Sequence, residues 1–160
     1  MNVTAPDLVR FKSEGHRFVL LTAYDFPTAQ IFDEAGAHVL LVGDTLSIFA
    51  LGQPTTLPVT MDQMIHHCQA VARGAPQALV VGDLPFGTYQ VSIDEAVHNA
   101  ARFFKEGGAR AVKLSSKVRF SSTSRRLRTA GCRRSDISAL PHSPCMRLEA
   151  TRFRRVRRNA

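Results

Sequence analysis

The sequence predicts an α/β fold for residues 1–114, the N-terminal half of a (β/α)₈ TIM barrel, and a tail at residues 115–160 that does not belong to it. Three observations lead to this prediction. Four short apolar segments recur at even intervals, helical patterns separate them, and the composition changes abruptly after Leu114. Strands and helices that alternate at this spacing form parallel βαβ units.

The four apolar segments are nearly continuous rather than alternating, which is typical of strands buried on both faces. They comprise residues 18–21, 38–42, 78–81 and 111–114. The helical patterns between them comprise residues 27–35, 61–73 and 93–106. A glycine, the residue that most often ends a helix, follows each helical pattern. Strand, helix and glycine therefore repeat as one unit.

The predicted helices also have recognisable starts. Asp25 is suited to cap the first helix, because its short polar side chain can accept hydrogen bonds from the free amides of the first turn. Thr60 and Ser92 precede the other two helices, and Gln63 and Glu95 follow three residues later, which is the spacing of a capping box. Capping and apolar pattern therefore agree on where the helices begin.

Two all-parallel architectures fit such units, the closed barrel and the open doubly wound sheet. The first strand-to-helix turn, residues 22–27, has no Gly-rich phosphate fingerprint, which disfavours a dinucleotide-binding doubly wound sheet. A complete barrel needs eight units and about 250 residues. Because the sequence contains four units, we expect residues 1–114 to form half of a barrel.

The two regions differ sharply in charge. Residues 1–114 carry 8 Lys/Arg and 11 Asp/Glu (8 − 11 = −3), whereas residues 115–160 carry 13 Lys/Arg and 2 Asp/Glu (13 − 2 = +11). The tail is rich in Arg and Ser, contains Lys117 as its single lysine, and has neither helical nor strand periodicity. We expect it to be disordered. One alternative is that the tail binds RNA or a membrane surface.

Cysteine usage and hydropathy indicate the compartment. Cys68, Cys132 and Cys145 have no metal-ligand spacing and are an odd number, which favours a reducing environment. No segment has the features of a signal peptide, and the apolar segments are much shorter than a membrane span. We therefore expect a cytoplasmic protein without membrane association.

Polar side chains gather at the predicted carboxyl ends of the strands, where barrel active sites are built. Asp44 and Asp83 each follow a glycine at the ends of the second and third strands, and Lys113 is the last polar residue of the fourth. Two carboxylates suit Mg²⁺, which typically takes one or two and fills its other positions with water and substrate. The alternative is that each aspartate caps the following turn or helix. The repeated Gly-Asp favours the metal site.

Six motifs resemble the ketopantoate hydroxymethyltransferase family, in its order and spacing and over essentially all of residues 5–114. They are LTAYD (21–25), LVGDTL (41–46), TLPVT (56–60), RGAP (73–76), GDLPF (82–86) and AVKL (111–114). The resemblance implies a (β/α)₈ barrel, a homo-oligomer, and small-molecule ligands without nucleic acid. It also implies transfer of a hydroxymethyl group from 5,10-methylenetetrahydrofolate to 3-methyl-2-oxobutanoate, which gives 2-dehydropantoate for pantothenate biosynthesis.

The resemblance assigns roles to individual residues. It implies that Asp44 and Asp83 hold Mg²⁺ and, through it, the substrate, and that Lys113 contacts the substrate and acts in catalysis. Thr45 stands where the family usually has a serine beside the substrate carboxylate. Mg²⁺ and Lys113 would then stabilise the enolate that forms when the C3 proton is removed. An alternative is another Mg²⁺-dependent barrel that forms or cleaves C–C bonds in 2-oxo acids; the TLPVT and DLPF motifs favour the hydroxymethyltransferase.

Three further candidates are expected to be structural. His66 and His67 are adjacent on a predicted helix, so their side chains point about 100° apart and are not expected to share a metal ion. One of them could line the site. Cys68 is expected to be a core or interface residue.

The resemblance stops after Leu114. The family continues there with Glu-Gly-Gly, and that glutamate belongs to its metal site, whereas this chain has Ser115 and Ser116. The family's general base, a glutamate from a later strand, has no counterpart either. However, the codons permitted for residues 132–152, taken one base out of register, can encode the family phrase GHIGFTPQSVHALGGYR. We therefore expect residues 115–160 to be an out-of-frame translation, and the chain as written to be inactive.

Overall fold

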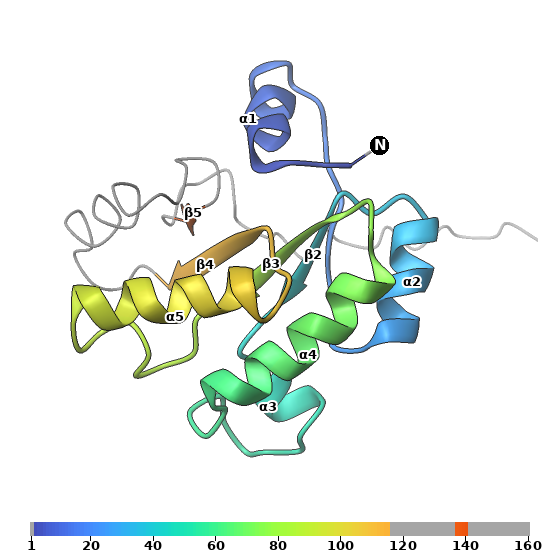
Figure 1. Cartoon of the computed structure of the whole chain (residues 1–160). Coiled ribbons are helices and arrows are strands. Elements are labelled where there is room, and N and C mark those ends of the chain that lie inside the picture. The colour runs from blue at the N-terminus through green and yellow to red at the C-terminus, as the bar shows by residue number, and fades with distance from the viewer. Residues whose placement is uncertain (1, 116–136, 141–160) are drawn as a thin grey trace, which may run out of the picture.

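The computed structural model describes residues 2–115 and the backbone of residues 137–140. Strands and helices alternate along this part of the chain (Figure 1). In chain order the elements are α1 (Ala5–Ser13), β1 (Leu20–Thr22), α2 (Phe26–Glu34), β2 (Val39–Val42), α3 (Leu46–Phe49), α4 (Met61–Gly74), β3 (Leu79–Asp83), α5 (Ile93–Lys105), β4 (Ala111–Ser115) and β5 (Ile137–Leu140). The four predicted strands and three predicted helices are all present, with ends shifted by one or two residues.

The strands form one parallel sheet in the order β1-β2-β3-β4-β5, so each strand pairs with its predecessor in the chain. A doubly wound sheet would reverse this order at a switch point, whereas an arc of a barrel keeps it. The register aligns Leu21 with Leu40, and Asp83 with Lys113. The order therefore distinguishes the two architectures and confirms the half-barrel prediction.

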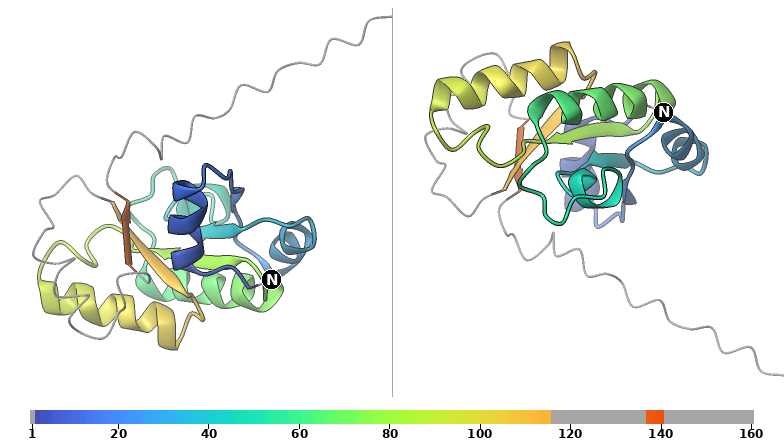
Figure 2. Two further views of the ribbon diagram at one scale, coloured as in Figure 1. Left: turned by 90° about the horizontal axis from the view of Figure 1, so that it is seen from above. Right: turned by 90° about the horizontal axis from the view of Figure 1, so that it is seen from below.

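Helices cover one face of the sheet. The helices α4 and α5 lie side by side along it, and α2 packs beside α4 (Figures 1 and 2). The larger core lies between these helices and the strands, and includes Leu40, Val80, Val112 and the ring of Phe103. These helix-facing strand residues would form the outside of a barrel, which identifies the opposite face as the barrel interior.

The interior face has a second, smaller core. Strand residues Val39, Leu79, Val81 and Ala111 are buried there against the N-terminal segment, including Leu8 of α1. Figure 2 shows α1 on the side of the sheet opposite to α4 and α5. The segment preceding α1 is also anchored near the start of β3, because the amide of residue 3 donates to the carbonyl of residue 77 at 2.9 Å. The helix α1 therefore covers the interior face near the amino ends of the strands.

The predicted helix starts are confirmed, with one difference of detail. Asp25 accepts from the Thr28 amide at 2.8 Å. Thr60 forms the complete capping box, since its hydroxyl accepts from the Gln63 amide and the Gln63 side chain accepts from the Thr60 amide. At the start of α5, the Ser92 hydroxyl accepts from the amide of residue 95 at 3.1 Å, which is the serine half of the predicted box.

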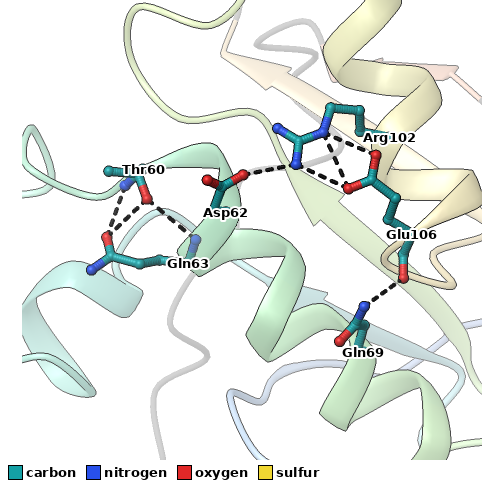
Figure 3. A network of polar contacts seen from close by, with 6 residues as sticks. All are labelled: Thr60, Asp62, Gln63, Gln69, Arg102 and Glu106. Atoms are coloured by element: carbon teal, nitrogen blue, oxygen red, sulfur yellow. Dashed lines mark hydrogen bonds and ion pairs between the residues drawn. The ribbon is translucent and has the colours of Figure 1, made fainter.

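A polar network ties α4 to α5 on their solvent side (Figure 3). Arg102 lies between two carboxylates, with Nη2 at 2.7 Å from Asp62 Oδ1 and 2.9 Å from Glu106 Oε2. Gln69 donates to the Glu106 carbonyl at 3.0 Å. Because exposed ion pairs contribute little stability, the network mainly sets how the two helices lie against each other.

Three elements were not predicted from the sequence. The helix α1 precedes the first strand, the single-turn α3 follows Thr45, and β5 lies in the tail. The strand β5 pairs with the open edge of β4, with Val112 opposite Ile137 and Ser115 opposite Leu140. The tail therefore contributes one short strand where none was expected. Most of the tail, for which the sequence predicts disorder, lies outside the described residues. No helix within the described ranges is long and apolar enough to cross a bilayer.

Candidate metal and substrate site

The predicted site residues lie together at the carboxyl ends of three adjacent strands. Asp83 ends β3 and is directly paired with Lys113 of β4. Val42, which ends β2, is paired with Gly82, so Asp44 lies just beyond the end of β2, next to Asp83 along the edge of the sheet. The strand register places Asp83 beside Lys113, and the turn after β2 brings Asp44 to the same edge.

Asp83 is buried and only half satisfied. Its side chain is 4% exposed, and Oδ2 accepts from Lys113 Nζ at 2.5 Å. Its other oxygen, Oδ1, is buried without a hydrogen-bond partner, the one such side-chain atom in the described part of the chain. An unsatisfied buried acceptor costs about 1–3 kcal/mol, and more when it is charged. Asp83 therefore presents an oxygen lone pair that a cation would satisfy.

Burial and the neighbouring charged groups shift the pKa of Asp83 in opposite directions. Burial raises the pKa of Asp83 to about 6, although the Lys113 ammonium acts to lower it. The nearby Asp44 carboxylate acts to raise the pKa of Asp83 further, whereas the main-chain amide of Asp44 acts to lower it. The proximity of two carboxylates at one edge favours any ligand that brings positive charge.

The alternative reading of the two aspartates as caps is not supported by the geometry. The amides of the turn after β2 donate to main-chain oxygens, since Leu46 N bonds to Gly43 O and Ser47 N to Asp44 O. Asp83 has Lys113 as its side-chain partner, and the amide of Leu84 donates to the Lys113 carbonyl. The main-chain amide of Asp44 does act on the Asp83 carboxylate, but among the described residues neither aspartate accepts from an amide of the turn or helix that follows it.

The donor set fits a hard divalent ion. Within residues 2–115, no group of three or more His, Cys, Asp or Glu side chains surrounds a common point. A tetrahedral zinc site needs such a group, whereas Mg²⁺ is held through one or two carboxylates, with water and substrate completing its shell. Asp44 and Asp83, together with the unpartnered Oδ1, match the second pattern.

Two hydroxyl groups meet at the same edge. Tyr24, which follows β1, and Thr45, which follows Asp44, form a hydrogen bond of 2.7 Å between Tyr24 Oη and Thr45 Oγ1. Sequence reasoning identified Thr45 but gave Tyr24 no role. The available signal was its position at the carboxyl end of the first strand, in the same place as Asp44 and Asp83 on theirs.

The repeated Gly-Asp has a packing explanation. A Cβ on Gly82 would lie 2.5 Å from the ring of Phe103, which is fully buried. A Cβ on Gly43 would lie 3.1 Å from Thr45 Oγ1. Gly82 therefore lets α5 pack directly on the end of β3 behind Asp83, and Gly43 leaves room for the Thr45 hydroxyl.

Among the described residues, the histidines and the cysteine of α4 form no metal-ligand group with the two carboxylates. The rings of His66 and His67 are nearly perpendicular, at 87°, and His67 Nδ1 lies 2.6 Å from the carbonyl oxygen of Tyr24. Cys68 is fully buried in the larger core, where burial raises the pKa of its thiol to about 12. The core prediction for Cys68 is therefore confirmed, and His67 contacts the site through Tyr24.

Fold and site together define a β/α-barrel protein with an acidic, lysine-containing site at the carboxyl ends of its strands. Comparison with known proteins agrees. The family model for ketopantoate hydroxymethyltransferase matches residues 2–133. The 3-methyl-2-oxobutanoate hydroxymethyltransferase of Oleidesulfovibrio alaskensis is 59% identical over 112 residues, which are 70% of this chain and 38% of that protein. The enzyme of the same name from Heliobacterium modesticaldum is 47% identical over 129 residues, 81% of this chain and 47% of that protein.

The chain therefore belongs to the ketopantoate hydroxymethyltransferase family, and it spans less than half the length of these two relatives. Among solved structures, phosphonopyruvate hydrolase in complex with oxalate and Mg²⁺ superposes with a TM-score of 0.67 at 14% identity, covering 84% of this chain and 51% of that one. At this identity the likeness concerns the fold, and it supports the barrel architecture.

Proposed function

We propose that this chain carries the metal-binding and 2-oxo-acid-binding half of a 3-methyl-2-oxobutanoate hydroxymethyltransferase. The complete enzyme would transfer a hydroxymethyl group from 5,10-methylenetetrahydrofolate to 3-methyl-2-oxobutanoate and give 2-dehydropantoate. The observation that carries the proposal is the unpartnered Asp83 Oδ1 beside Asp44 and Lys113, in a chain of this family.

Asp44 and Asp83 are the residues that would hold Mg²⁺, and the ion, when bound, would supply a Lewis acid for the keto oxygen of the substrate. Two observations support this assignment. Asp83 Oδ1 needs a partner, and a protein of similar fold was solved with oxalate, itself a chelating acid, together with Mg²⁺. The partly exposed Asp44 leaves one side of the pair open to a small ligand.

Lys113 would stabilise negative charge on the substrate. Its side chain is 23% exposed, and its ammonium is held by Asp83 Oδ2 at the edge of the sheet. As the C3 proton of the 2-oxo acid leaves, charge grows on the keto oxygen, and a fixed ammonium close by lowers the energy of that state. The same group would also attract the carboxylate. Thr45 would donate its hydroxyl hydrogen to that carboxylate.

Removal of the C3 proton needs a general base. We assign that role to no residue of this chain, because Asp44 and Asp83 are used as metal ligands and position 115 is a serine at the end of β4. The chain as written would therefore bind ligands without turning them over. The complete protein would be a cytoplasmic homo-oligomer that uses small molecules and no nucleic acid.

We further propose that the tail at residues 115–160 contains an out-of-frame translation of the second half of the barrel, with the family match itself extending to residue 133. The support is the family phrase that the codons of residues 132–152 permit one base out of register. Resequencing the gene beyond the Leu114 codon tests this. A single change of frame should give an open reading frame of about 250 residues that contains the phrase. A stop codon just past the phrase in that frame would contradict the proposal.

The ligand-binding proposal is tested by calorimetric titration of the whole chain with MgCl₂ and then with 3-methyl-2-oxobutanoate. We expect Mg²⁺ to bind, and the acid to bind tightly only when Mg²⁺ is present. Asp83→Asn is the matched control, since it keeps the shape of the side chain and removes the charge. Acid binding that ignores Mg²⁺, or that survives in Asp83→Asn, would contradict the proposed function. Turnover with 5,10-methylenetetrahydrofolate is expected from the frame-restored gene product.

A further inference from the structure

The hydrogen bond between Tyr24 and Thr45 joins the ends of two neighbouring strands. Tyr24 Oη and Thr45 Oγ1 lie 2.7 Å apart, and both side chains are partly buried. The ladder between β1 and β2 continues up to this point, because the Ala23 amide donates to the Leu41 carbonyl at 3.2 Å. The contact therefore lies directly beyond the paired ends of β1 and β2.

Tyr24 is held through both its side chain and its main chain. Its side chain packs against the larger core, and its neighbour Ala23 is 1% exposed. Its main-chain carbonyl oxygen lies 2.6 Å from His67 Nδ1. A carbonyl oxygen can only accept, so His67 must donate through Nδ1. The main chain and the ring of Tyr24 are thus both anchored, which fixes where the phenol hydroxyl lies.

The direction of the hydrogen bond decides what Thr45 can do. Each hydroxyl has one hydrogen and can also accept, so in the free protein either oxygen can be the donor. A carboxylate has no hydrogen and requires a donor. If Thr45 donates to Tyr24, its hydrogen is used and it presents only lone pairs to an anion. If Tyr24 donates to Thr45, the Thr45 hydrogen is free for the anion.

We propose that Tyr24 is the positioning residue for the carboxylate of the 2-oxo acid, an inference that rests on the proposed function. Tyr24 donates to Thr45, and Thr45 donates to the carboxylate, in a chain of two hydrogen bonds that point the same way. Such chains polarise each bond, which strengthens the last donor. An uncharged ligand group in the place of the carboxylate forms a weaker hydrogen bond with Thr45, so it benefits less from the polarised chain. Tyr24 therefore favours the acid over its uncharged analogues without touching it.

The test is Tyr24→Phe in the whole chain, with Mg²⁺ saturating and two probes titrated separately, 3-methyl-2-oxobutanoate and its methyl ester. The variant removes one oxygen atom and keeps the ring. We expect the affinity for the acid to fall about three- to tenfold, the usual range for one neutral hydrogen bond. The affinity for the ester and for Mg²⁺ should stay unchanged. An equal loss for acid and ester would overturn the inference.

A double-mutant cycle tests whether Tyr24 acts through Thr45. Thr45→Val should weaken acid binding more than Tyr24→Phe does, and Tyr24→Phe should have no further effect in the Thr45→Val background. Thr45→Ser keeps the hydroxyl and should retain the acid preference. Additive losses in the double variant would overturn the inference. The control is Tyr89→Phe, which removes the same atom from the other tyrosine of the chain, in the larger core.

A substitution that keeps the hydroxyl group of Tyr24 and changes only its strength as a donor distinguishes an effect on ligand binding from an effect on folding. Fluorotyrosine at position 24 makes the phenol a stronger donor, so the acid affinity should rise while the ester affinity stays the same. Unchanged or lower acid affinity would overturn the inference. If the unsubstituted chain binds neither Mg²⁺ nor the acid, the proposed function fails and this inference fails with it. Normal binding with an unaffected Tyr24→Phe variant would remove this inference alone.

Discussion

A buried aspartate and a cationic side chain lie at each edge of the sheet, one pair near the amino ends of the strands and one pair at the carboxyl ends. The two pairs differ in what their side chains bind. At the amino ends, Asp33 is 6% exposed and accepts from the amides of Gln77 and Ala78, the second at 2.7 Å. Arg110 donates to the carbonyl oxygens of Pro76 and Ala78. At the carboxyl ends, Asp83 and Lys113 bind each other and leave Oδ1 without a partner.

Under the proposed function, the difference would separate a structural charge from one that binds a ligand. Asp33 and Arg110 form hydrogen bonds with main-chain amides and carbonyls just before β3, which would otherwise lack these partners. Asp83 is as deeply buried but keeps one oxygen unsatisfied, a cost that a folded chain tolerates where a ligand will relieve it. Burial of a carboxylate therefore indicates little by itself, whereas an unused lone pair indicates a ligand.

The largest effect is expected at the carboxyl ends. Asp83→Ala and Asp44→Ala should each lower the Mg²⁺ affinity about 100-fold or more, because even residues that only orient metal ligands cost 10–100-fold when removed. The free energy of unfolding without metal should change little in Asp83→Ala, because removal of the unsatisfied buried oxygen offsets the loss of the ion pair with Lys113. Calorimetry with Mg²⁺ and urea denaturation measure the two quantities. Unchanged Mg²⁺ affinity in Asp83→Ala would show that the metal assignment is wrong.

The opposite result is expected at the amino ends. Asp33→Ala leaves the amides of Gln77 and Ala78 without their acceptor, and hydrogen bonds to charged groups contribute about 1.5–3 kcal/mol each. The free energy of unfolding should fall by about 3–6 kcal/mol for the two bonds together, while folded material keeps its Mg²⁺ affinity. Weakened Mg²⁺ binding without loss of stability would contradict the separation of the two ends.

Replacing Lys113 should affect ligand binding, whereas replacing Arg110 should affect stability. Lys113→Ala should weaken binding of 3-methyl-2-oxobutanoate about tenfold, because an ammonium that faces the anion is lost. Arg110→Ala should instead lower the unfolding temperature and leave the acid affinity of the folded fraction unchanged. Acid titrations and thermal melts of both variants make the comparison. Similar acid affinities in the two variants would mean that Lys113 does not contact the substrate.

A smaller effect is expected from pH in the absence of metal. Burial raises the pKa of Asp83 from an ordinary value near 3.8 to about 6, so the folded state holds this proton more tightly than the unfolded state. The corresponding stability is fully present below pH 3.8 and is lost as the pH rises through about 6. The Asp83→Asn variant should therefore gain stability relative to the parent chain between pH 4 and pH 8. A difference that is constant with pH would contradict the raised pKa.

The fold was predictable because its signals are local. Apolar segments gave the strands, and the Thr60–Gln63 capping box and the glycines gave the helix ends. Asp44 and Asp83 were predictable as site candidates because parallel strands end at one edge, so position along each strand was sufficient. The half-barrel prediction implied that the strands pair in chain order, and the structure was needed to confirm it, since local patterns do not state which strand pairs with which.

The features that could not be predicted from the sequence depend on strand register and on packing between elements. The bond from Tyr24 to Thr45 spans 21 positions and exists because β1 and β2 pair in one particular alignment. The closeness of Gly82 to Phe103 depends on how α5 lies on β3. The strand β5 was missed for a different reason: pairing with β4 requires an open edge more than it requires a strongly apolar sequence.

The order of the strands also bears on how this chain is made. Each strand pairs with the strand synthesised just before it, so the half-barrel can form in the sequence in which it leaves the ribosome. The pairing of β1 with β2 and of β2 with β3 requires no residue translated after Asp83. The residues of these contacts all precede the proposed change of reading frame, so that change leaves their sequence, including Asp44 and Asp83, intact.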